Sequence, residues 1–199
     1  IGLLAAIDVK KGGVSRGIIT KGIARDIVNS LPPFVDSVLV TSFDNVEKII
    51  ETCKFVGNKT LQICWPRDFN DKWVEKIREN LPYMKIINVV HVTDKSAVQK
   101  ANRMESFSDA ILLDSRIGNQ LGGTGRTHNW DISRQIVQNS NIPVILAGGL
   151  NLENLKEAIE KVRPWGVDVH TGVENPDWSK NYEKIKRFIQ IAKSEEAPH

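Results

Sequence analysis

Short apolar segments rich in β-branched residues recur along the whole chain and alternate with segments whose apolar residues have helical spacing. The apolar segments are 1–8, 36–42, 60–64, 85–92, 109–114, 143–148 and 166–172. Helical spacing is seen at Ile23, Ile27 and Leu31, and again at Leu155, Ala158, Ile159 and Val162. Strands that are apolar throughout, each followed by a helix, are typical of a parallel sheet covered by helices. The pattern therefore predicts an α/β protein.

The number of repeating units favours a barrel over an open sheet. Seven βα units are one short of the eight-fold (β/α)8 TIM barrel, and doubly wound sheets usually have fewer strands. We expect the absent first unit to precede Ile1. The sequence contains no linker, low-complexity stretch or internal repeat, so residues 1–199 are expected to form a single barrel domain.

Composition excludes several classes of function. The net charge is +3 and the basic residues are scattered among acidic ones, which argues against nucleic-acid binding. No run of about 18 apolar residues predicts a membrane span. Cys53 and Cys64 are too few for a disulfide scaffold and lack metal-binding spacing, so a reducing cytoplasm is the expected location. The histidines show no paired spacing either, and no metal site is expected.

Two glycine-containing segments near the C-terminus predict a phosphate site. Gly148 and Gly149 follow an apolar strand and allow close approach of the backbone, and Asn151 can cap a helix whose N–H groups point at an anion. Thr171 and Gly172 end the next strand, and many barrels bind phosphate between the loops after their last two strands. A glycine turn that only connects strand and helix is the alternative for the first segment taken alone.

Asp114 is the best candidate for acid and base chemistry. It ends the apolar strand AILLD, where desolvation would disfavour the charged carboxylate and keep the carboxyl protonated near neutral pH, as a general acid requires. The alternative is an aspartate that caps the following turn, and Asp8 ends the first strand in a similar way. Asp168 is expected inside its strand on the same face as His170, so both face either the barrel interior or the helices. On the inner face they would lie in a hydrogen-bond network or near the site.

The segment 115–130, which contains Gly122 and Gly123, is long enough to form a lid or a substrate-binding loop. Its GGTGRT sequence only superficially resembles a nucleotide P-loop. Arg126 stands where that motif requires lysine, and Gln120 stands where it requires its first glycine.

Taken together, LLDS, GGTGRTHNW, PVILAGGLNLENLKEAIEKVRPWGVDVHTGVE and ARDIVNSLPPFVDSVLV resemble the phosphoribosylanthranilate isomerases of tryptophan biosynthesis. The resemblance implies an eight-fold barrel that needs no cofactor or metal and acts on a small phosphorylated substrate. The expected state is a monomer or a homodimer, and the sequence does not distinguish the two. It implies an Amadori rearrangement of N-(5′-phosphoribosyl)anthranilate to 1-(2-carboxyphenylamino)-1-deoxyribulose 5-phosphate. Asp114 corresponds to the family's general acid, and Arg16 to the arginine that binds the anthranilate carboxylate.

The family's general base is a cysteine in a KICG motif on the first strand, and that motif is absent from these residues. Cys64 is a rival for the base, since it is expected to share a strand face with Gln62, although a small buried thiol without function is the simpler interpretation. The alternative function is a divergent barrel that has lost the cysteine base and binds or converts another phosphorylated metabolite.

Overall fold

The computed structural model of the chain describes residues 2–6, 18–64, 71–117, 120–121 and 127–194. Contacts divide these residues into two compact units. The first extends to Val89 and includes Phe107–Asp109, and the second consists of Val90–Ser106 and the chain from Ala110 onward. Strand β4 (Lys85–His91) passes from the first unit into the second.

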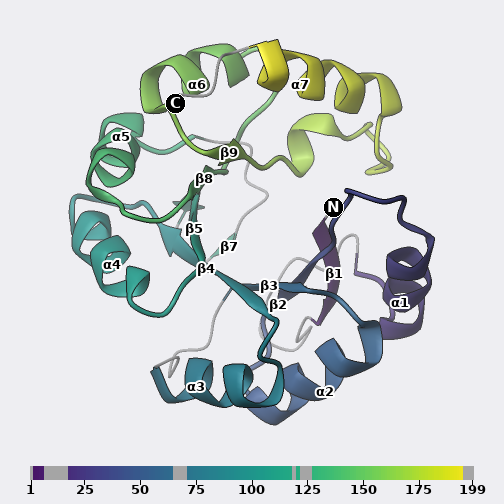
Figure 1. Ribbon diagram of the computed structural model, residues 1–199. Helices are drawn as coiled ribbons and strands as arrows, with labels where there is room; N and C mark the ends of the chain where they lie inside the picture. The colour runs from purple at the N-terminus through teal and green to yellow at the C-terminus, as the bar shows by residue number, and fades with distance from the viewer. Residues whose placement is uncertain (1, 7–17, 65–70, 118–119, 122–126, 195–199) are drawn as a thin grey trace. The chain divides into compact units, whose positions relative to one another are not determined.

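The first unit alternates strands with helices. Its elements are β1 (Gly2–Ala6), α1 (Lys21–Ser30), β2 (Val38–Thr41), α2 (Val46–Val56), β3 (Thr60–Ile63), α3 (Asp71–Asn80) and the beginning of β4. The strands are parallel and follow one another in chain order, with Leu39 opposite Leu61 and Leu61 opposite Ile86. Figure 1 shows the three helices on one face of β1–β3, where these leucines and isoleucines form a buried core.

Local sequence signals set the ends of these helices. The Thr20 hydroxyl accepts a hydrogen bond from the N–H of Ile23 at the start of α1, and the Asn45 side chain accepts one from Lys48 at the start of α2. Gly57 ends α2 in the left-handed conformation, with φ of 80°. Each cap satisfies backbone groups that the helix leaves unpaired.

The second unit repeats the alternation. Its elements after β4 are α4 (Ser96–Glu105), β5 (Ala110–Asp114), β6 (Arg116–Ile117), β7 (Gln120–Leu121), α5 (Trp130–Asn139), β8 (Val144–Leu146), α6 (Leu155–Val162), β9 (Gly166–Val167), the 3-10 turn η2 (Thr171–Val173) and α7 (Tyr182–Ser194). Strands β5, β8 and β9 are parallel neighbours, with Leu113 opposite Leu146 and Leu146 opposite Val167. Strands β6 and β7 pair with each other as a short antiparallel hairpin.

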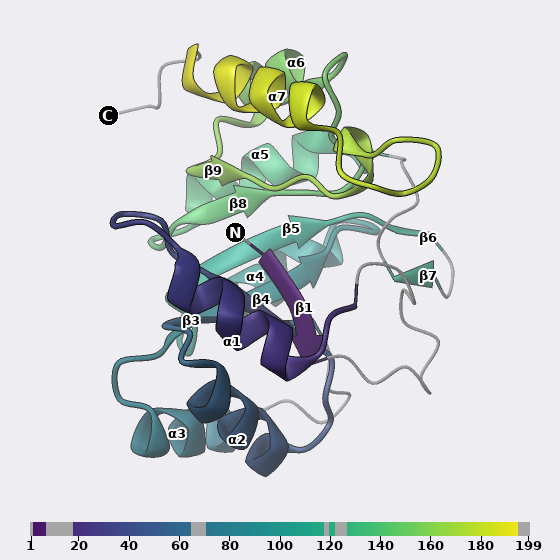
Figure 2. The ribbon, with the colours of Figure 1, turned by 90° about the vertical axis from the view of Figure 1, so that its right-hand side faces the viewer.

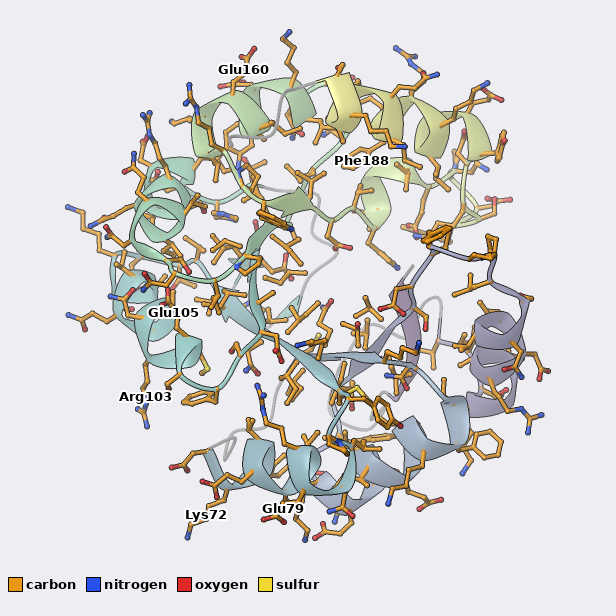
Figure 3. The ribbon with its side chains drawn as sticks, viewed as in Figure 1. Lys72, Glu79, Arg103, Glu105, Glu160 and Phe188 are labelled. Carbon is orange, nitrogen blue, oxygen red and sulfur yellow. The ribbon has the colours of Figure 1, made fainter. Side chains whose placement is uncertain are left out.

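The helices of the second unit bury one face each. In Figure 2, α6 and α7 lie side by side, in agreement with their direct contacts. Phe188 of α7 points toward the strands and is buried, whereas Glu160 of α6 points away from them (Figure 3). This division between apolar and charged faces is the one that the helical spacing of the sequence predicts.

The observed elements match the expected α/β pattern, with three differences. Each expected strand segment contains a strand, but the strands are shorter than the apolar runs. Strand β9 ends at Val167, so Asp168 follows the strand instead of lying inside it, although its N–H still donates to the Leu146 carbonyl over 2.9 Å. The β6–β7 hairpin was not predicted, because two-residue strands leave no periodicity to detect.

Candidate active site

Polar side chains lie where the three parallel strands of the second unit end. Because β5, β8 and β9 run parallel as neighbours, their carboxyl ends meet at one edge of the sheet. Asp114 is the last residue of β5, Gly148 and Gly149 follow β8, and Asp168 follows β9. This edge therefore brings together three of the segments that the sequence singles out.

Asp114 is held in a desolvated position at this edge. Burial raises the pKa of its carboxyl from 3.8 to about 6, although the hydrogen bond from the Ser115 N–H opposes the shift and repulsion from Asp168 adds to it. That N–H lies 2.8 Å from the Asp114 Oδ1 atom. The direction of the pKa shift is the expected one, but at pH 7 most of the carboxyl would be ionised. The group can thus exchange a proton close to neutral pH.

Asp168 belongs to a second group of charged residues. Burial raises the pKa of its carboxyl, while the positive charges of His170 and Lys180 oppose that shift. The Lys180 ammonium lies 2.7 Å from the Glu174 carboxylate and 3.0 Å from the backbone oxygen of His170. Burial and Lys180 lower the pKa of the His170 imidazole, which lies 3.6 Å from Glu174. These contacts tie the segment after β9 into one polar cluster.

The loop after β8 and the turn after β9 touch each other. A Cβ atom at Gly172 would overlap with the Leu150 backbone oxygen and lie 3.0 Å from the Asn151 Cα, so only glycine fits there. Gly148 and Gly149 adopt φ angles of 81° and 72°, which side chains disfavour. The two segments that were predicted to share a phosphate are therefore packed against each other.

Asn151 was expected to cap α6, but the N-cap of that helix is Asn154, and Asn151 instead closes the turn that leads into it. Its side-chain oxygen accepts hydrogen bonds from the N–H groups of Glu153 and Asn154, and Asn154 in turn accepts from the Asn151 N–H over 2.9 Å. Those three N–H groups are consequently occupied. Within the described part of the chain, the backbone N–H groups of Gly149 and Gly172 donate no hydrogen bond. They are among the backbone donors that this pair of loops offers to an anion.

A chain of hydrogen bonds that sequence reasoning did not find links the end of β5 to α5. The His128 ring joins two buried serines: its Nδ1 atom lies 2.9 Å from the Ser115 hydroxyl, and its Nε2 atom lies 2.6 Å from the Ser133 hydroxyl. Burial lowers the pKa of His128 to about 4, so the ring is neutral at physiological pH. The spacings of 13 and 5 residues follow no helix or strand period, which is why no sequence signal indicated them.

Comparison with known proteins identifies the family to which the sequence belongs. The sequence model of the N-(5′-phosphoribosyl)anthranilate (PRA) isomerase family matches residues 8–191, most of the chain. The chain belongs to the PRA isomerase family. The PRA isomerase of Methanocella arvoryzae is 36% identical to it over 192 residues, which are 96% of this chain and 85% of that protein.

Solved structures agree with this membership. The crystal structure of the PRA isomerase from Thermotoga maritima is 32% identical and has a TM-score of 0.79, covering 92% of this chain and 84% of that one. A PRA isomerase crystallised with reduced 1-(o-carboxyphenylamino)-1-deoxyribulose 5-phosphate is 30% identical with a TM-score of 0.75, at the same coverage. The resemblance inferred from the sequence motifs is confirmed, and the parallel α/β architecture is that of PRA isomerases.

The other residues that the sequence suggests for the site are only partly described by the structure. Arg16, Gly122 and Gly123 lie outside the described residues, so their predicted roles in substrate binding stay predictions. Gln62 and Cys64 share a face of the first unit as expected, with the amide nitrogen of Gln62 3.3 Å from the Cys64 sulfur. Cys53 is fully buried and burial raises the pKa of its thiol to about 12, so it stays protonated.

The described residues contain neither a membrane-spanning helix nor a metal cluster. No helix among them is both long and apolar enough to cross a membrane. No cluster of His, Cys, Asp and Glu side chains among them is arranged to hold a metal ion.

Proposed function

We propose that this chain catalyses the reaction for which its family is named, the Amadori rearrangement of N-(5′-phosphoribosyl)anthranilate to 1-(2-carboxyphenylamino)-1-deoxyribulose 5-phosphate in tryptophan biosynthesis. The observation that carries the proposal is the Asp114 carboxyl at the end of β5, within the matched family region. It is partly buried, and desolvation raises its pKa to about 6. A relative of 30% identity binds the reduced form of this product.

Asp114 would act as the general acid. In this step its proton passes to the ribose ring oxygen as the bond between that oxygen and C1′ breaks, and the nitrogen lone pair forms a C=N bond. Loss of the C2′ proton to a base then gives the enol, which becomes the ketone product. A carboxyl with a pKa of about 6 can release a proton and regain it near neutral pH, as such a cycle requires.

The substrate phosphate would lie between the loop 148–151 and the turn 171–173. Support comes from the contact of Gly172 with Leu150 and from the open N–H groups of Gly149 and Gly172. Thr171 adds a hydroxyl at the same turn, and Asp168 lies three residues before it at the end of β9. A crystal grown with phosphate that holds no anion at these two glycines would contradict this placement.

Arg16 would pair with the anthranilate carboxylate, and Gly122 and Gly123 would contact the substrate, by analogy with the family motifs. Arg16→Ala is expected to raise KM with little change in kcat, since the lost pair binds a group remote from the reacting carbon. The partner that we propose is this small phosphorylated substrate. Sedimentation of the purified chain distinguishes a monomer from a homodimer.

The full eight-fold barrel is also a proposal, supported by the parallel strands of both units and by the likeness to PRA isomerase structures. In it, a further strand with the family's cysteine motif would supply the base. The mass and N-terminal sequence of the protein from its natural host test this directly.

Two experiments decide the function. The natural protein should convert phosphoribosylanthranilate, followed by loss of anthranilate-type fluorescence, and its gene should restore growth of a tryptophan auxotroph that lacks the isomerase. The alternative, a divergent barrel for another phosphorylated metabolite, predicts phosphate binding at Gly149 and Gly172 without either activity.

A further inference from the structure

His128 lies outside every role assigned so far, yet its ring is among the most constrained polar groups of the second unit. It joins Ser115, the residue immediately after Asp114, to Ser133 in the middle of α5. Ser115 is 3% exposed and Ser133 is fully buried, so neither hydroxyl exchanges partners freely with water. Buried hydrogen bonds of this kind are costly to break, because the orphaned group finds no replacement.

The neutral ring can make both bonds in only two ways. One ring nitrogen carries a hydrogen and donates it to a serine oxygen, and the other nitrogen accepts from the remaining serine hydroxyl. In either arrangement Ser115 is connected through the ring to helix α5. The position of Ser115 therefore depends on a residue 13 positions away in the sequence.

Ser115 in turn touches the proposed acid. Its backbone N–H donates to the Asp114 Oδ1 atom over 2.8 Å and lowers the pKa of that carboxyl against the effect of burial. A short bond from an N–H to a carboxylate also restricts the rotation of the carboxylate plane. Whatever holds Ser115 in place consequently holds the acid in its orientation.

We propose that His128 is a positioning residue for the isomerase reaction: its bridge between Ser115 and Ser133 fixes the N–H that orients the Asp114 carboxyl. The inference rests on the proposed function, because it assigns to His128 an effect on the general acid of that reaction. His128 itself need not touch the substrate.

The first test compares His128→Phe in two backgrounds. Phenylalanine keeps a flat ring of similar size and removes both hydrogen bonds. We expect kcat to fall about 5- to 20-fold, the effect of losing about one buried hydrogen bond, with KM changed less than about twofold. In an Asp114→Asn background, His128→Phe should lower kcat by less than about twofold further, because there is no longer an acid to orient. His128→Asn, which can restore one of the bonds, should recover part of the rate.

The second test does not need activity. The carboxyl pKa of Asp114, followed by carbon NMR with labelled aspartate, should rise in His128→Phe, since the Ser115 N–H no longer stabilises the ionised form. Asp168 also acts on the Asp114 carboxyl, so its resonance is followed in the same titration as a reference for a general change of the site. Ser133→Ala, which keeps the ring and the Ser115 contact, should raise the Asp114 pKa by a smaller amount and serves if His128→Phe does not fold.

The outcomes separate this inference from the proposed function. An equal loss of kcat in both backgrounds, or an Asp114 pKa that neither His128→Phe nor Ser133→Ala changes, would mean that His128 only stabilises the fold. If Asp114→Asn is as active as the unsubstituted chain, the assignment of the acid fails, whatever His128 does.

Discussion

A side chain at Gly148 would overlap with the backbone nitrogen and the hydroxyl of Ser115. The first residue of the proposed phosphate loop therefore lies directly against the residue that follows the proposed acid. The two functions proposed for the site, binding the phosphate and protonating the ring oxygen, would therefore depend on the same contact. Substitutions at this contact should affect both.

Gly148→Ala is expected to lower kcat and raise KM together, each by about tenfold or more, because the new methyl group displaces Ser115 and the left-handed backbone is strained. Gly57→Ala is the matched control. Gly57 has a similar φ of 80°, but nothing lies within 4 Å of the added atom. It should lose about 1 kcal/mol of stability with unchanged kinetics. Steady-state kinetics of both variants decide the prediction, which fails if they behave alike.

Gly172→Ala should act mainly on binding. The added methyl would push the turn 171–173 away from Leu150 and separate the two proposed phosphate donors, so KM should rise about tenfold or more while kcat changes less. Gly166→Ala provides the comparison, since its nearest neighbour, Ile145, would be at an ordinary 4.0 Å. Titration with inorganic phosphate should show the same difference without turnover. Equal phosphate affinity in the two variants would argue against the site.

Asp114→Asn should lower kcat by about 10²-fold or more and leave KM nearly unchanged, since general acid catalysis supplies about 10²- to 10⁴-fold. The amide keeps the shape of the side chain and can still accept from the Ser115 N–H. Circular dichroism and the melting temperature establish that the variant is folded. Normal turnover would show instead that Asp114 is a capping residue.

The raised pKa of Asp114 also predicts how stability depends on pH. A carboxyl whose folded-state pKa is about 6, against 3.8 when exposed, stabilises the fold fully below about pH 4, and this contribution is lost as pH rises through about 6. Relative to Asp114→Asn, the free energy of unfolding of the unsubstituted chain should fall by on the order of 2 to 3 kcal/mol as the pH rises from about 4 to above 6. Urea unfolding of both proteins at pH 4.5 and pH 7.5 measures the change. The prediction is wrong if the difference in unfolding free energy is the same at both pH values.

Cys64→Ala tests the identity of the base. If the base belongs to the family's cysteine motif, kcat should stay within about threefold, because the Cys64 thiol, which lies 3.3 Å from the Gln62 amide nitrogen, then takes no part in proton transfer. Cys53→Ala is the control for the loss of a thiol. The buried Cys53 thiol has a pKa of about 12, so it stays protonated and cannot act as a base. A fall of about 10²-fold in Cys64→Ala alone would identify Cys64 as the base.

The sequence predicted the parts of the structure that depend on local patterns. The apolar run that ends in Asp114 became β5, and the partial burial of its last carboxyl followed from that placement. Gly148 and Gly149 adopted the positive φ angles that glycine favours, and Asn151 closes a turn just before α6, whose N-cap is Asn154. These features are local because glycine permits positive φ angles at its own position and the asparagine side chain accepts hydrogen bonds from N–H groups a few residues away.

Features set by tertiary contacts were not predicted. The need for glycine at position 172 comes from Leu150, which is distant in sequence, and the bridge from Ser115 through His128 to Ser133 connects a strand end with a helix. The β-branched residues that flank Asp168 predict a strand around it, but the ladder stops at Val167. None of these contacts leaves a periodic trace in the sequence.

The reciprocal hydrogen bonds of Asn151 and Asn154 have a consequence for the speed and strength of ligand capture. Because Asn154 also holds the Gly149 carbonyl over 3.0 Å, the loop keeps one shape before any anion arrives. Binding then costs little conformational entropy, and such preorganisation allows a few backbone donors to hold a phosphate firmly. If both asparagines were replaced by alanine, the loop would have to become ordered each time phosphate binds. Phosphate would then dissociate faster, although the backbone donors proposed to bind it would still be present.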